Sequence, residues 1–251
     1  MILSTIVMGR LAVISGLPVV IAFPAGLLVA LVCGYVNGLL VTKLKLPPFI
    51  VTLGTWSVFG ALLLFYSQSS TIRQQDIAAA APFLQLMGVS FKVGGAPITL
   101  GSLVMLGLAA IVWYVLNRTA FGRHIYASGD DPGAARLAGI STDRTLLAVY
   151  SFAGFICGIA GWIEIGRIGA VSPLAGGTAN LDSITAVVIG GTSLFGGRGS
   201  IIGTLIGALI VGVFRDGLSL YGLDDLWQEF TVGILIIVAV AIDQWVRGIS
   251  A

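Results

Sequence analysis

Charged and polar side chains are rare in this sequence, so those that border apolar stretches are the first candidates for chemistry. Asp182 lies beside Asn180 and Ser183, directly before an apolar segment. Burial of a carboxylate is costly without a partner or a task. Asp182 therefore either has a functional role or caps the helix that follows, and the sequence leaves both interpretations open. Glu164 and Arg167 have the spacing of an ion pair across one helical turn.

The sequence offers little material for catalysis. His124 is the only histidine and lies among basic residues, so neither a His-based triad nor a metal site with several His ligands can be built. There is no phosphate-binding G-x-x-x-x-G-K-[ST] motif. Cys33 and Cys157 lie inside apolar runs, where packing between helices is expected. The prediction is a protein that is not an enzyme, with no catalytic residue, no metal and no cofactor of its own.

Residues 129–140 have the pattern of a short, complete helix. Asp131 suits the N-cap, Pro132 the first helical position, and Gly139 a left-handed turn at the end. Three alanines make one side of this helix smooth: Ala134, Ala135 and Ala138. Such a helix can be a docking element for a cytoplasmic motor or an ordinary loop helix.

The composition shows what kind of protein must position these residues. Of the 251 residues 57% are hydrophobic and only 10% are charged, and the mean hydropathy is +1.04. A soluble domain carries roughly 25% charged residues, because its surface faces water. The 13 basic residues are spread along the chain, so no patch dense enough for nucleic acid exists. The chain is therefore predicted to be an integral membrane protein.

Four uncharged stretches are long enough to cross a bilayer, which takes about 20 residues. The predicted spans are residues 19–42, 49–66, 99–117 and 145–166. Pro18 and Pro24 are expected to mark the start of the first. A last span is bounded by Trp227 and Trp245 as interfacial anchors.

The segment between the fourth and the last span is cut into shorter apolar runs by Arg167, Asp182, Arg198, Arg215 and Asp216. Each run is too short to cross, which predicts broken or re-entrant helices around a cavity. Residues 183–215 form either a re-entrant pair or two short spans, so the count of crossings is five to seven.

Lysine and arginine collect in the short link 43–48 and in the loop 118–144, whereas 67–98 holds only Arg73 and Lys92. The first two segments are therefore expected in the cytoplasm and the third outside. Glycines spaced by four predict close contacts between helices: Gly34 and Gly38, Gly154 and Gly158, and Gly199, Gly203 and Gly207.

Three stretches resemble the permeases of ABC importers in their ribose-type sugar form. Residues 129–140 are similar to the family's coupling-helix segment. Residues 34–41 leading into 47–55, and 181–194 continuing through 196–199, are similar to two further stretches in the same order and spacing. The resemblance runs from about Leu17 to the C-terminus.

The resemblance implies an all-α polytopic permease domain over residues 1–251. It implies a second permease, either a second copy of this chain or a related subunit, a cytoplasmic ABC ATPase that binds the ATP, and a periplasmic sugar-binding protein. It also implies a place among the lipids of the bacterial inner membrane. Residues implied to couple to the ATPase are Asp131, Pro132, Ala134, Ala135, Arg136 and Gly139. Residues implied to lie along the translocation path are Asn37, Asn180, Asp182, Thr185, Gly190 and Gly191.

Two departures from the family pattern stand out. Asn180 occupies a position where members usually carry Glu before the Leu-Asp pair. Members also carry two further hydrophobic segments near the N-terminus, with a Gly-Ile-Asp-Leu-Ser-Val-Gly-like stretch of which only Leu3-Ser4 matches here. The resemblance therefore implies a chain about two helices short at its N-terminus.

The predicted function is the membrane subunit of an ATP-driven importer for a monosaccharide of ribose, xylose or fructose type. An importer for another small polar solute, such as a nucleoside, an autoinducer sugar or a branched-chain amino acid, is the nearest alternative. An ion-coupled carrier would need ionisable groups at mid-membrane, and no long predicted span contains one.

Overall fold

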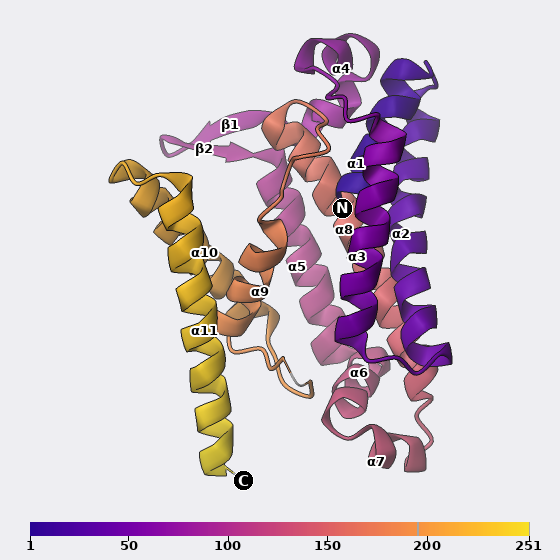
Figure 1. Ribbon diagram of the computed structural model, residues 1–251, viewed down its shortest axis with the longest axis vertical. Coiled ribbons are helices and arrows are strands. Elements are labelled where there is room, and N and C mark those ends of the chain that lie inside the picture. The colour runs from indigo at the N-terminus through magenta and orange to yellow at the C-terminus, as the bar shows by residue number, and fades with distance from the viewer. Residues whose placement is uncertain (195, 251) are drawn as a thin grey trace. The chain divides into compact units, whose positions relative to one another are not determined.

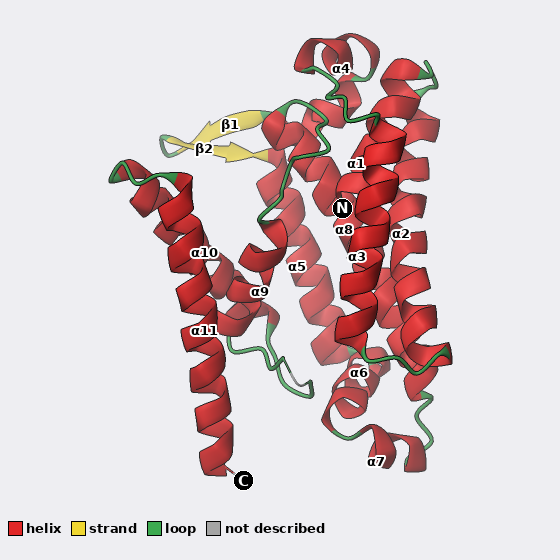
Figure 2. Ribbon diagram, viewed as in Figure 1, coloured by secondary structure: helices red, strands yellow, loops and turns green. Residues whose placement is uncertain are grey.

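The computed structural model describes residues 1–194 and 196–250, apart from the side chains of Val93, Asp225, Ile236, Ala239, Val240 and 242–250. Trp245, the second predicted anchor, thus lies outside the described side chains. The chain divides into two compact units. The first consists of Met1–Leu108 and Ser141–Ala175, and the second of Ala109–Ile140 and Gly176–Ala251. Within each unit the described elements are almost all helical (Figure 2).

The first unit (Figure 1) begins with a helix that continues into a short π-helix, followed by two long helices. These are α1 (Ile2–Gly9), η1 (Arg10–Ile14), α2 (Val19–Lys43) and α3 (Pro48–Ser67). Shorter elements follow: α4 (Gln74–Ala80), the 3-10 helix η2 (Pro82–Gly88), and the antiparallel strands β1 (Ser90–Val93) and β2 (Ala96–Thr99). The helix α8 (Thr142–Ile168) completes the unit.

The second unit contains the segment predicted as a coupling helix and the last third of the chain. Its helices are α6 (Ala120–Asp130), α7 (Pro132–Leu137), α9 (Ala179–Ile189), α10 (Ile201–Leu220) and α11 (Asp225–Ser250). The helix α5 (Leu100–Arg118) begins in the first unit and ends in the second.

Among the described residues, five helices are long and apolar enough to cross a membrane: α2, α3, α5, α8 and α10. The first four confirm the predicted spans to within a few residues. Pro18 is the N-cap of α2, as predicted, but Pro24 lies inside that helix and does not mark a start.

In the last third of the chain, the prediction of a re-entrant pair or two short spans at 183–215 is wrong for the second segment. Only α9 is short, with 11 residues. By contrast α10 has 20 residues and runs through Arg215 and Asp216 to Leu220, about 30 Å at 1.5 Å per residue. The helix continues past Arg215, whose side chain has an acidic partner, Asp182, on the neighbouring helix.

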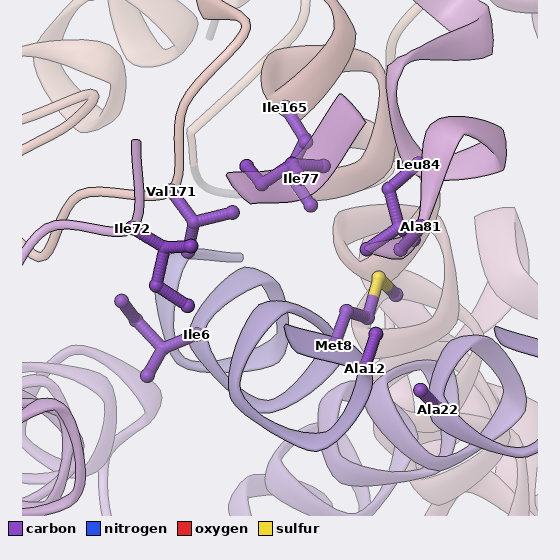
Figure 3. Close-up of a cluster of buried hydrophobic side chains, with 10 residues drawn as sticks. All are labelled: Ile6, Met8, Ala12, Ala22, Ile72, Ile77, Ala81, Leu84, Ile165 and Val171. Atoms are coloured by element: carbon purple, nitrogen blue, oxygen red, sulfur yellow. The ribbon is translucent and has the colours of Figure 1, made fainter. Parts of the chain in front are cut away.

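The core of the first unit is built around α1, to which the sequence analysis assigned no helix. Ile6 and Met8 are 1% and 0% exposed. By contrast, most residues of the long apolar helices in this unit are not buried. Ile6 and Met8 pack with side chains from α4, η2 and α8 (Figure 3). The full cluster is Ile6, Met8, Ala12, Ala22, Ile72, Ile77, Ala81, Leu84, Ile165 and Val171.

The helices α2 and α8 cross where the sequence predicted a close approach. A Cβ atom added at Gly34 would lie 2.9 Å from the Cα of Gly154, and one at Gly158 would lie 3.0 Å from the Cβ of Ala30. The backbones therefore touch with no side chain between them. The small-residue spacing on these two helices is confirmed as a packing feature of the bundle.

Gly154→Ala is expected to destabilise the first unit. The new Cβ would lie 2.5 Å from the carbonyl oxygen of Ala30, so α2 and α8 would have to separate. Such overpacking typically costs about 1–3 kcal/mol. The measurement is the unfolding midpoint in detergent, with Gly107→Ala as the control because a Cβ there meets nothing within 4 Å. Equal unfolding midpoints for the two variants would refute the close contact between α2 and α8.

Candidate functional site

The segment predicted as a coupling helix has the caps that its sequence indicates. Asp131 is the N-cap of α7, and its Oδ1 accepts hydrogen bonds from the backbone N–H of Gly133 at 2.8 Å and of Ala134 at 3.0 Å. Pro132 takes the first helical position. Gly139 has φ +83°, and its N–H donates to the carbonyl oxygen of Arg136. All three sequence features of this helix are thus confirmed.

Most residues of α7 are exposed. Leu137 is 93% exposed, whereas Ala135 is only 4% exposed and anchors the helix. The other five residues predicted to contact an ATPase are all exposed: Asp131, Pro132, Ala134, Arg136 and Gly139. The helix therefore exposes one large apolar side chain, Leu137, and one cation, Arg136, beside smaller exposed residues.

The second polar site lies on the neighbouring helices α9 and α10. Asp182 Oδ1 lies 2.6 Å from a terminal guanidinium nitrogen of Arg215, and the two side chains are 28% and 25% exposed. The contact is a close ion pair without aligned hydrogen-bond geometry, since the same Oδ1 and the Nε of Arg215 are buried and make no hydrogen bond. The hydroxyl of Thr178 adds a long hydrogen bond of 3.3 Å to Asp182 Oδ2.

Asp182 does not cap α9. The helix begins at Ala179 with Thr178 as its N-cap, so Asp182 is its fourth residue. The capping interpretation is therefore wrong, because the helix starts one turn earlier than the polar cluster suggested. Arg215 was the residue that sequence analysis missed. An arginine within an apolar helix needs an acidic partner, and Asp182 is the acidic residue at the start of the preceding apolar segment.

The other predicted path residues of the second unit have different environments. Asn180 is exposed, and its carbonyl oxygen accepts a hydrogen bond from the Ser183 hydroxyl at 2.8 Å. Thr185 is fully buried, and its hydroxyl donates to the carbonyl of Leu181 at 2.6 Å. Gly190 packs against the backbone of Gly203 on α10, and Gly191 has φ +78° in the following turn.

Asn37, the remaining predicted path residue, lies on α2 in the first unit. Its Oδ1 is buried and has no hydrogen-bond partner among the described residues. An unsatisfied buried amide oxygen is costly and marks a place where a polar partner would be accommodated. In the same unit Arg167 donates two hydrogen bonds to Glu164, at 3.0 and 2.9 Å, which confirms the predicted ion pair.

The contact between α10 and α9 uses the predicted small residues. A Cβ at Gly207 would meet the backbone of Ala186, and one at Gly203 would meet Gly190. Gly199 precedes α10 and faces Thr192, so only two of the three spaced glycines serve the helix contact. This contact holds Asp182 and Arg215 on adjacent helices.

Comparison with known proteins agrees with these features. The family model described as branched-chain amino acid transport system / permease component matches residues 1–240. The fructose import permease protein of Rhizobium meliloti is 55% identical over 251 residues, which cover 100% of this chain and 70% of that protein.

Two further relatives have similar names and coverage. The ribose import permease protein of Bacillus subtilis is 40% identical over 92% of this chain and 70% of its own length. The D-allose transport system permease protein of Escherichia coli is 35% identical over 96% and 72%. No solved structure matches the chain. The chain therefore belongs to the branched-chain amino acid transport system / permease component family and is a multi-pass protein of the bacterial inner membrane.

Proposed function

We propose that the chain is the transmembrane subunit of an ATP-driven importer for a monosaccharide. The observation that carries the proposal is the 55% identity to a fructose import permease along all 251 residues. Relatives named for ribose and D-allose support the same substrate class. A monosaccharide carries several hydroxyl groups and would need polar side chains along its path. Among the described residues few polar side chains lie inside apolar helices, so those few are the candidates for that path.

The proposal assigns ATP hydrolysis to a separate cytoplasmic subunit that docks on α7, so this chain is not itself an enzyme and needs no cofactor. It also includes a second permease copy and a periplasmic binding protein that delivers the sugar. The capped helix α7, with an open surface and a left-handed turn at its end, supports the docking role.

The proposal places Asp182 and Arg215 beside the path of the solute. Arg215 lies 14 positions after the first residue of α10, about 21 Å along a helix of about 30 Å. The ion pair therefore lies within the length of a candidate span, where ionisable groups are costly and usually serve a polar pathway. Asn180, Thr185, Gly190, Gly191 and, in the other unit, Asn37 remain proposed path residues.

Reconstitution tests this function. The chain, with its proposed ATPase subunit and binding protein, is placed in proteoliposomes, and uptake of labelled fructose, ribose and D-allose is measured with and without internal ATP. We expect uptake of one of these sugars only with ATP and the binding protein. Uptake driven by an ion gradient without ATP would favour a secondary carrier. ATP-dependent uptake of a nucleoside or branched-chain amino acid alone would identify a different solute.

A further inference from the structure

The end of α6 touches the loop between α9 and α10 backbone to backbone. A Cβ at Gly129 would lie 2.7 Å from the amide nitrogen of Gly197, and one at Gly196 would lie 2.7 Å from the carbonyl oxygen of Gly129. No side chain fits between these segments. Both belong to the second unit, although they are almost 70 residues apart in sequence.

Tyr126 adds a directional bond to this contact. Its hydroxyl donates to the carbonyl oxygen of Gly199 at 3.0 Å. Tyr126 lies three residues before Gly129, so both face the loop from the same side of α6. We call these residues the loop contact: Tyr126 and Gly129 on α6, and Gly196, Gly197 and Gly199 in the loop.

The described residues on the two sides of the loop are tied together by backbone hydrogen bonding. Gly196 and Gly197 have φ values of +97° and +74°, conformations that side chains other than glycine rarely adopt. The N–H of Ser193 donates to the carbonyl of Arg198 at 2.9 Å and closes the turn. A displacement at Gly197 therefore passes to Arg198 along the backbone, and from Arg198 through this hydrogen bond to Ser193.

The loop contact lies between two features of the proposed function. On one side Gly129 is two residues before Asp131, the N-cap of α7. On the other side the loop continues directly from α9, because the N–H groups of Gly191 and Thr192 still bond to the carbonyls of Val188 and Val187. The same α9 carries Asp182.

We propose that the loop contact is the joint through which movement of α7 is passed to α9. Its residues are positioning residues: they touch neither solute nor ATP, and they act by holding α6 against the loop. Close-packed backbone atoms have little room to yield, so they transmit a displacement that flexible side chains would absorb. The inference rests on the proposed function, since it requires an ATPase that moves α7.

Gly129→Ala tests the joint. The added methyl group pushes the loop away from α6 but leaves the exposed surface of α7 unchanged. We expect the ATPase subunit to co-purify at the wild-type level and to hydrolyse ATP, while the number of ATP molecules used per sugar rises by roughly tenfold or more. A residue that served only stability would lower the amount of protein and leave this ratio unchanged.

Tyr126→Phe is the second variant, which removes only the hydroxyl bond to Gly199 and should raise the ratio in the same direction by a smaller factor. Gly212→Ala on α10 is the control, because a Cβ there meets nothing within 4 Å. A wild-type ratio in Gly129→Ala, or loss of ATPase co-purification in it, overturns the inference. If Gly129→Ala is absent from membranes, the ratio in Tyr126→Phe decides. Failure of the wild-type chain to show ATP-dependent uptake would instead overturn the proposed function.

Discussion

Gly139→Pro is expected to abolish co-purification of the ATPase subunit with this chain. Gly139 has φ +83°, whereas the proline ring fixes φ near −65°. Proline also removes the N–H that donates to the carbonyl of Arg136 at 3.0 Å. The turn that ends α7 cannot form, so the helix loses its defined end and the exposed surface changes shape. The readout is pull-down of the ATPase subunit from detergent-solubilised membranes.

A matched control separates this effect from general backbone strain. Gly222 has nearly the same conformation, with φ +82°, in the turn between α10 and α11. Gly222→Pro should strain the second unit to a similar degree yet keep the ATPase subunit bound. Arg136→Glu tests the charge of the surface without breaking the turn, because one reversed charge in the last helical turn costs only about 0.3–1 kcal/mol. Unchanged pull-down in both Gly139→Pro and Arg136→Glu would exclude α7 as the docking element.

The features that could be predicted from sequence are those whose cause is local. The caps of α7 are set by Asp131, Pro132 and Gly139, all within nine residues, and the structure has each in its expected place. The helices α2, α3, α5 and α8 follow from the four long uncharged stretches of the sequence. The contact of Gly34 with Gly154 was visible as spacing on each helix, although spacing does not tell which helix pairs with which.

Features that depend on tertiary contacts were missed. The helix α1 has only eight residues, too short for the criterion of a span, yet it is buried by contacts with distant segments such as Ile72 and Val171. Arg215 was treated as the end of an apolar run, because its partner Asp182 lies 33 positions earlier. The loop contact combines Gly129 with Gly197, and no local pattern links those two segments.

Removing the charge of Asp182 is expected to impair sugar uptake severely. Asp182→Asn leaves Arg215 three-quarters buried without its ionic partner. Loss of a partly exposed pair of this kind costs about 1–2 kcal/mol of stability, less than for a fully buried pair. That loss is too small to remove the protein from the membrane. Uptake should nevertheless fall by roughly tenfold or more if the pair borders the path of the solute.

Exchanging the two charges distinguishes a path role from a purely structural one. The double variant Asp182→Arg with Arg215→Asp restores an attraction between α9 and α10, but it moves the cation to α9 and the anion to α10. If the pair only joins the helices, the double variant recovers the uptake that Asp182→Asn lost. If the pair orients the solute, uptake stays low while membrane levels recover. Asp216→Asn is the control, since Asp216 is the exposed neighbour of Arg215 and should leave uptake unchanged.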